Sequence, residues 1–313
     1  IEKYFKVPHA RKDVVMGPGD DCALLTLPPD AQLAVSTDTL VSGVHFFPDM
    51  DPVDLGYKAL AVNLSDLAAM GAEPRWVSLA LTLPAVNEAW VAGFAEGFLE
   101  LAEYYNVALV GGDMTRGPLS ITVSVKGSVP AGRALMRSGA KAGDGVYVTG
   151  TLGDAALALS HLLGKRTLNE NQLAAVLPRL DHPHPRILAG QALRGLASSA
   201  LDLSDGLASD LGHILKASGV RAQIDLNLLP LSPVLQDAVP AMDAWQLALA
   251  GGDDYELCFT VPQEHHGALD TALANCGVKF TRIGRILAGE PGIDYLQDEQ
   301  PVELHLKGWD HFA

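Results

Sequence analysis

The sequence predicts a mixed α/β protein built as two halves. Short apolar stretches typical of β-strands alternate with amphipathic helical patterns along the whole chain of 313 residues. A stretch of glycine and basic residues with little apolar periodicity separates the halves. Hydrophobic residues make up 48% of the chain and charged residues 19%, so each half can bury a core, and a membrane span of about 20 apolar residues is not expected. We therefore expect a soluble α/β protein.

The boundary between the halves is expected near residue 140. The separating stretch runs from Gly132 to Gly145 and contains Arg137 and Lys141. We therefore expect an N-terminal α/β domain over residues 1–140 and a C-terminal α/β domain over residues 141–313.

The first half contains four expected strands, with helical segments between the first three. The strands are expected at residues 33–36, 76–83, 107–110 and 119–125. The clearest helix begins at Asp51, a good N-cap residue followed by Pro52 at the first helical position. It ends at Gly71, a residue type that favours the position just past a helix.

The second half repeats the alternation of strands and helices. Strands are expected at residues 146–149, 200–203 and 256–261, and helices from Gly153, over 185–196 and over 206–216. No repeat of 20 to 50 residues is present, which sets aside solenoids and propellers.

Charge and cysteine content restrict the partners and the compartment. The formal net charge of −15 repels nucleic acid and anionic membranes, and no run of Lys or Arg offsets it. Aspartate outnumbers glutamate by 25 to 12, and Asp favours caps, turns and metal sites. Three widely spaced cysteines argue against a disulfide framework, and no signal-peptide pattern is seen, so we expect the cytoplasm.

One short pattern recurs, in which an apolar strand runs into Gly, Ser or Thr and then Asp. It occurs at residues 19–21, 36–38, 111–113, 202–205 and 251–254. Glycine at strand ends lets backbone N–H groups approach an anion, and clustered carboxylates favour hard cations such as Mg²⁺. Five such ends predict an acidic, glycine-lined cleft for a metal-bound polyphosphate. For any single motif, a turn or a helix N-cap remains the alternative, and Asp205 can cap the helix that follows it.

Two isolated features have both a structural and a functional interpretation. Asn63 and Asp66 share one face of the helix that begins at Asp51, either as a structural polar pair or with Asp66 as a metal carboxylate. His45 is either a structural imidazole or part of the site. The chain has no P-loop, no protein-kinase motif set and no nucleophile elbow.

The motifs together resemble those of the thiamine-monophosphate kinases, within the aminoimidazole-ribonucleotide-synthetase-like superfamily. They lie in the same order across nearly the whole chain: GPGDD at 17–21, STD at 36–38, GVHF at 43–46, AVNLSDLAAMGA at 61–72, GGD at 111–113, DLSDG at 202–206, GGDDYEL at 251–257 and KGWDHF at 307–312. The resemblance implies a two-domain architecture with mixed sheets, in which the N-terminal sheet pairs with that of a second subunit. It implies transfer of the γ-phosphoryl group of ATP to thiamine monophosphate with several Mg²⁺ ions, the final step of thiamine diphosphate biosynthesis.

The resemblance also implies roles for individual residues. The implied metal ligands are Asp21, Ser36, Thr37, Asp38, Asp66, Asp113, Asp202 and Asp205. The implied ATP contacts are Tyr105, Gly112, Asp113, Arg137 and Ser204, and the implied substrate contacts are His45, Asp253 and Trp309. Catalysis is expected to rest on Asp38, Asp113, Arg137 and Asp205. The family usually has Glu where this chain has Asp253, whose side chain is one methylene shorter, so a water can bridge the gap.

The expected mechanism is direct in-line attack by a phosphate oxygen of the substrate, which needs no general base. A homodimer is expected because apolar residues on successive strands need covering. These residues are Val77, Leu79, Leu81, Ile121, Val123 and Val125. The alternatives are a ring-closing ATP-dependent ligase of the superfamily, a non-catalytic nucleotide-binding module and, less favoured, a hydrogenase-maturation dehydratase, which needs a cysteine-terminated tail. For Trp309, the alternative to a substrate contact is a role in packing.

Overall fold

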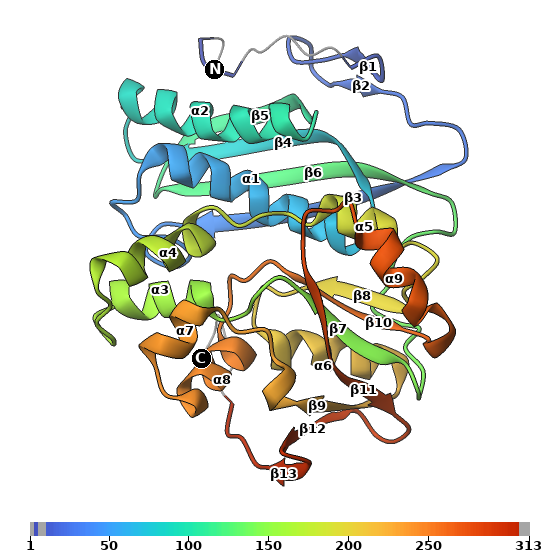
Figure 1. Ribbon diagram of the computed structural model, residues 1–313. Helices are drawn as coiled ribbons and strands as arrows, with labels where there is room; N and C mark the ends of the chain where they lie inside the picture. Colours follow the sequence, from blue (N-terminus) through green and yellow to red (C-terminus); the bar gives the residue numbers. More distant parts are fainter. Residues whose placement is uncertain (1–2, 6–10, 307–313) are drawn as a thin grey trace. The chain divides into compact units, whose positions relative to one another are not determined.

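A computed structural model describes residues 3–5 and 11–306 of the chain (Figure 1). The chain divides into two compact units, each with its own sheet. Unit 1 comprises residues 1–67 and 72–132, and unit 2 comprises residues 68–71 and 133–313. The division between the units falls at Gly132, where the glycine-rich separating stretch begins.

Unit 1 is built on a four-stranded mixed sheet in the order β3-β6-β4-β5. The strands are β3 (Ala31–Val41), β4 (Glu73–Leu83), β5 (Ala108–Arg116) and β6 (Ser120–Pro130). β4 and β5 are parallel, and the other two pairs are antiparallel. All four expected strands are confirmed, each longer than its sequence pattern predicts, because backbone pairing continues beyond the apolar positions.

Two helices pack closely together in unit 1 (Figure 1): α1 (Pro52–Ala69) and α2 (Glu88–Tyr104). α1 begins as predicted, since the Asp51 carboxylate accepts the N–H of Val53 at 2.8 Å, and Gly71 follows it with φ +64°. A Cβ at Gly97 of α2 would lie 1.9 Å from a carbonyl oxygen of α1, so the helices cross at a distance that only glycine permits.

The apolar strand residues of unit 1 need no second subunit to cover them. The six residues named for the dimer are all at most 5% exposed within this one chain. α1 and α2 lie over the sheet (Figure 1), and Leu60 and Leu64 of α1 are fully buried as well. The sequence-based reason for a dimer is therefore wrong. The opposite face of the sheet carries polar side chains such as Thr39 and Thr122, whose hydroxyls are 2.9 Å apart.

A short N-terminal hairpin is anchored to this sheet by one carboxylate. The hairpin strands are β1 (Val14–Met16) and β2 (Leu24–Leu25). Just before β1, the Asp13 carboxylate accepts hydrogen bonds from Arg11, Arg75 and Trp76. The guanidinium of Arg11, followed by that of Arg75, lowers the pKa of Asp13 to about 2. These bonds hold the hairpin, and with it the loop at residues 17–23.

Unit 2 contains a seven-stranded mixed sheet in the order β13-β12-β9-β11-β7-β10-β8. The strands are β7 (Gly145–Thr149), β8 (Ser199–Asp202), β9 (Arg221–Asp225), β10 (Leu257–Val261), β11 (Phe280–Leu287), β12 (Gly292–Gln297) and β13 (Gln300–Val302). Among the strand pairs of unit 2 that the structure describes, only β9–β12 is parallel. The helices are α3 (Asp154–Leu162), α4 (Glu170–Asp181), α5 (Ile187–Leu193), α6 (Leu207–Ser218), α7 (Pro233–Ala238), α8 (Ala241–Ala250) and α9 (His266–Leu273), with 3₁₀ turns η1 (Leu226–Leu228) and η2 (Gln263–His265).

The fold confirms the α/β class with a mixed sheet in each unit. The strands expected in unit 2 are found as β7, β8 and β10, and the expected helices as α3, α5 and α6. The N-cap of α6 is Gly206, which has no side chain to cap the helix, so Asp205 is not the N-cap residue. No helix among the described residues is both long and apolar enough to cross a membrane.

Candidate active site

The first group of expected site residues lies between β3 and α1. The Ser36 hydroxyl donates to the Asp66 carboxylate at 2.5 Å. β3 is an edge strand of the sheet, and its Asp38 N–H donates to the side chain of Asn63 at 3.1 Å. Asn63 in turn donates to Ala59 O at 3.0 Å. Asn63 and Asp66 thus share the face of α1 that meets β3, as the helical spacing predicts.

Asp38 and Asp66 form a carboxyl pair. Burial of Asp38, together with the charge of Asp66 and a hydrogen bond between the two side chains, raises the pKa of Asp38 to about 6. Two neighbouring carboxylates hold a proton between them when no cation offsets their charge. Two carboxylates and the hydroxyl of Ser36 are hard oxygen donors of the kind that Mg²⁺ takes, so these residues fit that ion. Thr37, which alternates with them along β3, is exposed.

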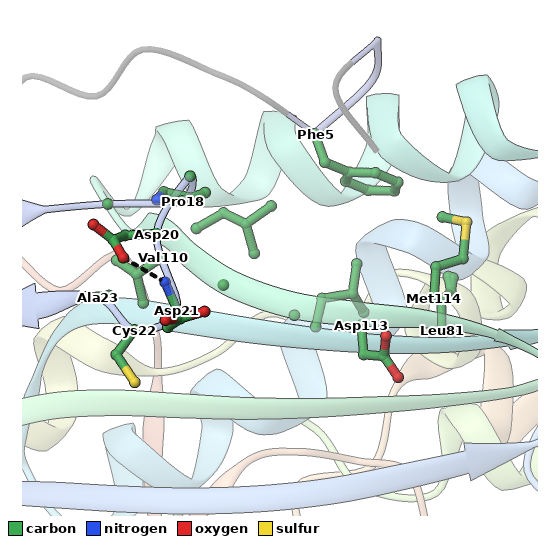
Figure 2. Close-up of a pocket in the computed structure, with 16 residues that line it drawn as sticks. Phe5, Pro18, Asp20, Asp21, Cys22, Ala23, Leu81, Val110, Asp113 and Met114 are labelled. Atoms are coloured by element: carbon green, nitrogen blue, oxygen red, sulfur yellow. Dashed lines mark hydrogen bonds between the residues drawn. The ribbon is translucent and has the colours of Figure 1, made fainter.

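The second group lines a cavity of about 290 Å³ beside β5 (Figure 2). The loop at residues 17–23 forms one wall of this cavity, and residues 109–114 of β5 form another. Asp21 and Asp113 both line it, and the Asp21 N–H is held by the Asp20 carboxylate at 2.8 Å. The structure therefore brings two of the five Gly/Asp motifs to one pocket.

Gly112 in this wall has a structural requirement of its own. A Cβ there would lie 1.9 Å from the carbonyl oxygen of Leu79 on the neighbouring strand. Around Gly111, by contrast, a Cβ would meet nothing within 4 Å. Close packing of the two strands therefore explains why residue 112 is glycine. At Gly111, the absence of a side chain leaves free space beside the strand.

The two groups of unit 1 lie at opposite edges of one sheet. Asp38 of β3 is aligned across the strands with Val123, Leu79 and Gly112. Three strand spacings separate Asp38 from Gly112, which is roughly 14 Å. Among the described residues, no three His, Cys, Asp or Glu side chains are grouped so that they could hold a metal ion. The expectation that these motifs share one cleft is thus not met by unit 1 on its own.

The third group lies in unit 2, where two loops extend the pairing of β8 with β10. The Leu203 N–H donates to Glu256 O, and the Tyr255 N–H donates to Leu203 O, each at 2.8 Å. The Asp253 N–H then donates to Ser204 O at 2.9 Å. Asp202, at the end of β8, is 9% exposed. Asp202, Ser204, Asp205 and Asp253 are therefore neighbours, although the sequence separates their two motifs widely.

The loop at 251–256 has a strained backbone. Asp253 and Tyr255 have φ angles of +67° and +48°, which L-residues adopt at a cost of about 1–3 kcal/mol each. Gly252 must be glycine, because a Cβ would lie 2.5 Å from Ser204 O. Such strain persists only where the surrounding contacts determine the conformation.

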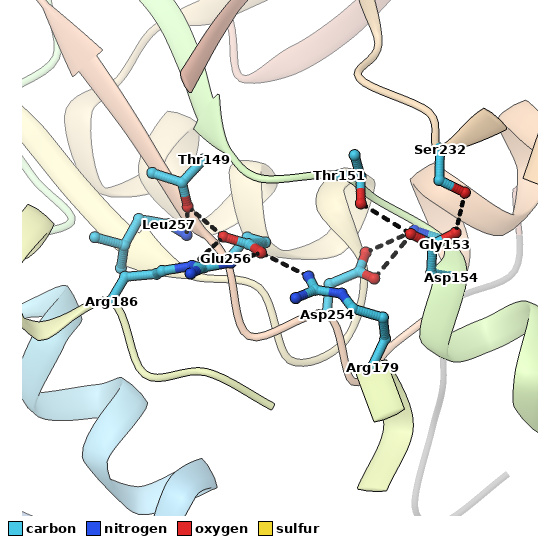
Figure 3. Close-up of polar contacts among 10 residues, drawn as sticks. All are labelled: Thr149, Thr151, Gly153, Asp154, Arg179, Arg186, Ser232, Asp254, Glu256 and Leu257. Carbon is cyan, nitrogen blue, oxygen red and sulfur yellow. Dashed lines mark hydrogen bonds and ion pairs between the residues drawn. The ribbon is translucent and has the colours of Figure 1, made fainter. Parts of the chain in front are cut away.

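Those contacts come from a buried ion cluster (Figure 3). The Glu256 side chain is 1% exposed and accepts from Arg186 at 2.5 and 2.7 Å, from Arg179 at 2.6 Å and from Thr149 at 2.6 Å. Asp254, also buried, accepts the Gly153 N–H at the start of α3. Burial raises the pKa of Asp254 well above its usual value. In the 251–257 motif, Asp254 and Glu256 therefore hold the loop, whereas Asp253 is only partly buried.

Sequence reasoning missed Asp210, which holds the other loop. This residue of α6 is 4% exposed, and its carboxylate accepts the Asp205 N–H at 3.0 Å. Burial is the largest cause that raises the pKa of Asp210 to about 7, and the Arg137 charge opposes it. The available signal was an acidic residue in the first turn of a helix that begins with glycine.

The remaining expected residues are more dispersed. His45 is half-buried, and its Nδ1 accepts the Val41 N–H at 3.0 Å, which orients the ring. Tyr105 ends α2, with its ring edge-on to Tyr104. Arg137 is exposed. Trp309 and the rest of the 307–312 motif lie outside the described residues.

Comparisons with known proteins place the chain in a class. The family model for AIR synthase related protein, N-terminal domain, matches residues 19–129, and that for the C-terminal domain matches residues 141–295. The chain is thus an AIR synthase related protein in both of its halves. Hydrogenase maturation protein HypE, in complex with ATP, is 20% identical with a TM-score of 0.77 and covers 98% of this chain and 92% of its own, a likeness of fold alone.

Closer relatives give the particular family. The thiamine-monophosphate kinase of Escherichia coli K12 is 57% identical over 315 residues, covering 100% of this chain and 97% of the relative. That of Bacillus subtilis is 38% identical, covering 98% and 95%. The crystal structure of the Stenotrophomonas maltophilia K279a enzyme is 45% identical with a TM-score of 0.87, covering 94% and 93%. The chain belongs to the thiamine-monophosphate kinase family.

A further solved structure is described as AaThiL complexed with AMPPCP and TMP. It is 34% identical to this chain with a TM-score of 0.79, covering 92% of this chain and 89% of its own.

Proposed function

We propose that this protein is an ATP-dependent kinase that phosphorylates thiamine monophosphate to thiamine diphosphate, the final step in the biosynthesis of that cofactor. The observation that carries the proposal is 57% identity over the full chain to a thiamine-monophosphate kinase. A relative with the same fold binds AMPPCP, a non-hydrolysable ATP analogue, together with TMP. The glycine-lined, Asp-bearing cavity of unit 1 offers the donors that a metal-bound polyphosphate requires.

The reaction proposed is a single in-line displacement. A terminal phosphate oxygen of thiamine monophosphate forms a bond to the γ-phosphorus, the bond to the β-γ bridging oxygen breaks, and ADP leaves with that electron pair. The attacking oxygen is already anionic at neutral pH, so no residue must remove a proton. No phospho-enzyme forms, and catalysis rests on positioning and charge neutralisation.

Mg²⁺ is proposed as the metal, held by the eight ligands that the resemblance implies. When bound, it neutralises the charge that accumulates on the phosphate oxygens. The support is chemical: Asp38, Asp66 and Ser36 form a compact set of hard oxygen donors, and the first two carry a proton that a cation would displace. Asp38, Asp113, Arg137 and Asp205 are proposed as the catalytic residues.

The nucleotide is proposed to contact Tyr105, Gly112, Asp113, Arg137 and Ser204, and the thiamine monophosphate His45, Asp253 and Trp309. The half-buried His45 is suited to substrate contact because its Nδ1 is occupied by a backbone N–H. The other ring nitrogen therefore carries the proton and can donate.

A homodimer through the N-terminal sheet is also proposed, on a different ground from the one the sequence suggested. Edge strand β3 exposes Leu33 by 51% and Val35 by 57%, and an exposed apolar edge strand favours pairing. We also propose a cytoplasmic location, with small-molecule partners and no nucleic acid, which the −15 charge supports. Cys22, Cys258 and Cys276 are free thiols, as a reducing compartment favours.

Phosphorus NMR of the protein with Mg-ATP and thiamine monophosphate tests the function. We expect a new diphosphate signal from thiamine diphosphate and an equal amount of ADP, without free phosphate. Free phosphate in place of thiamine diphosphate, with turnover of a formyl-glycinamidine ribonucleotide, would identify a ring-closing ligase instead. Binding of ATP without turnover of either substrate would identify a non-catalytic module.

A further inference from the structure

The loop at residues 204–206 has a backbone that is constrained on three sides. On one side, Ser204 O accepts the Asp253 N–H at 2.9 Å. On the second, the backbone of Gly206 packs closely against residues 249–251, since a Cβ there would lie 2.9–3.0 Å from their backbone atoms. On the third, the N–H of Asp205 donates to the carboxylate of Asp210 at 3.0 Å. Of these three constraints, only the last is made by a side chain.

Asp210 performs a task that the start of α6 cannot perform alone. Helix starts leave backbone N–H groups without helical partners, and a side chain at the N-cap usually satisfies one of them. The N-cap here is Gly206, which makes no side-chain bond. Asp210 lies in the first turn and accepts from the loop instead, and a carboxylate is favoured at this end of the helix dipole.

Burial makes the arrangement specific. Asp210 is 4% exposed, so its carboxyl group is removed from most solvent, and it accepts the N–H of Asp205 in the loop. A buried acid in contact with the loop of another acid, Asp205, is unfavourable for folding alone, because like charges repel. The presence of Asp210 at this position is better explained by the geometry that it imposes on the loop.

We propose that Asp210 is a positioning residue of the reaction, which fixes the backbone of the 204–206 loop so that Ser204 and Asp205 present their side chains to the nucleotide and its metal. This inference rests on the proposed function for the roles of Ser204 and Asp205. Asp210 itself touches neither substrate. Its carboxylate acts through the loop, by accepting the N–H of Asp205.

Two substitutions weaken the hydrogen bond between the Asp210 carboxylate and the loop to different degrees. Asp210→Asn keeps the shape and one acceptor but loses the charge, and Asp210→Ala removes both acceptors. We expect kcat/KM for Mg-ATP to fall about tenfold in Asp210→Asn and further in Asp210→Ala, since charge-assisted bonds are about twice as strong as neutral ones and small misplacements are costly. KM for thiamine monophosphate should change less than KM for ATP.

A matched control separates positioning from folding. Asp144 is also 4% exposed in unit 2, and its carboxylate likewise accepts a backbone N–H, that of Lys141 at 3.0 Å. Asp144→Asn should lower the melting temperature without changing kcat or either KM. Equal kinetic effects of Asp144→Asn and Asp210→Asn would overturn the proposal, because general destabilisation would then explain both.

Amide hydrogen exchange gives a readout that does not depend on activity. The Asp205 amide should exchange slowly in the wild type, faster in Asp210→Asn and fastest in Asp210→Ala. Faster exchange with unchanged kinetics in both variants would show a helix cap only and would overturn the proposal. If Asp210→Ala does not fold, the isosteric Asp210→Asn decides.

Failure of the proposed function would be recognised separately. A wild-type protein that does not turn over thiamine monophosphate contradicts the function. Calorimetric titration of the protein with AMPPCP and Mg²⁺ would then still test the role of Asp210. AMPPCP should bind more weakly to Asp210→Asn than to the wild type, and equally well to Asp144→Asn. Equal affinity of wild type and Asp210→Asn in this titration would overturn the positioning role.

Discussion

The backbone N–H of Asp253 donates to the carbonyl oxygen of Ser204 at 2.9 Å and so joins two acidic motifs that are distant in the sequence. Asp253 has a φ of +67°, so this bond holds a residue whose conformation is unfavourable in isolation. The 251–256 loop, which carries the proposed substrate contact, is therefore fixed in position beside the 204–206 loop, which carries proposed metal and nucleotide contacts. A change in one loop must affect the other.

Neutralising single carboxylates tests the metal assignment. We expect Asp38→Asn and Asp205→Asn each to lower kcat by orders of magnitude with an unchanged circular dichroism spectrum, because the charge is lost at nearly constant volume. Thr39→Val, on the same strand as Asp38 but in contact with Thr122, serves as the control and should keep its activity. Near wild-type rates in both Asn variants at limiting Mg²⁺ would mean that the two residues only stabilise local turns and do not bind the metal.

Magnesium binding should release protons in a defined pH range. The pKa of Asp38 is raised to about 6, so at pH 6 roughly half of the metal-free molecules hold a proton there. Mg²⁺ requires the ionised form, and its binding should release about half a proton at pH 6 and almost none at pH 8. Calorimetry in buffers of different ionisation enthalpy measures this number. An equal number of released protons at pH 6 and pH 8 would contradict the assignment. So would a release at pH 6 that persists in Asp38→Asn.

The buried ion cluster should be sensitive to loss of one partner. Glu256→Gln leaves Arg179 and Arg186 without their carboxylate, and breaking a buried pair in this way costs about 3–5 kcal/mol. Asp294→Asn, which breaks the exposed pair with Arg221, is the control, with an expected cost of about 0–1 kcal/mol. Urea unfolding followed by circular dichroism measures both. Comparable small losses would show that the cluster does not hold the strained loop.

The proposed dimer should depend on the exposed edge of unit 1. Light scattering at micromolar concentration should give twice the chain mass of 33.0 kDa for the wild type. Val35→Asp should shift the mass toward one chain, because it places a charge on a surface that the partner would cover. Val44→Asp, at another exposed apolar position, should leave the dimer intact. A wild-type monomer under these conditions contradicts the proposal.

Trp309 should act on substrate affinity. Trp309→Ala should raise KM for thiamine monophosphate several-fold, because stacking of an indole on a cationic thiazolium contributes on the order of 1 kcal/mol. KM for ATP should change much less, and Trp309→Phe should recover part of the loss. Equal changes in both KM values, or a lower melting temperature with unchanged kinetics, would assign Trp309 to packing.

Local signals were sufficient where the physics is local. The start of α1 follows from Asp51 and Pro52, and its end from Gly71, because capping and backbone preferences act within one or two turns. The spacing of Asn63 and Asp66 likewise predicted a shared face. Short elements such as α7 and β13 were missed, because a few residues show no measurable periodicity.

The grouping of the acidic motifs could not be obtained in this way. All five motifs resemble one another in sequence, yet Asp38 and Asp113 lie on strands at opposite edges of the sheet. In the 251–257 motif, adjacent residues have different environments, since Asp253 is partly exposed and Asp254 is buried and accepts the Gly153 N–H at the start of α3. Strand order and side-chain burial depend on contacts between distant segments.

The sequence by itself determined the α/β class, the main helices and strands and the family resemblance, and it supplied the residues that we propose for the chemistry. These follow from apolar periodicity, local capping and motif order, which are properties of neighbouring residues. Only the tertiary structure decided that α1 and α2 cover the apolar face of the first sheet, that Arg179 and Arg186 meet Glu256, and that Asp210 holds the loop of Asp205. Each of these depends on which distant segments pack together, and burial then determines which charges must be paired.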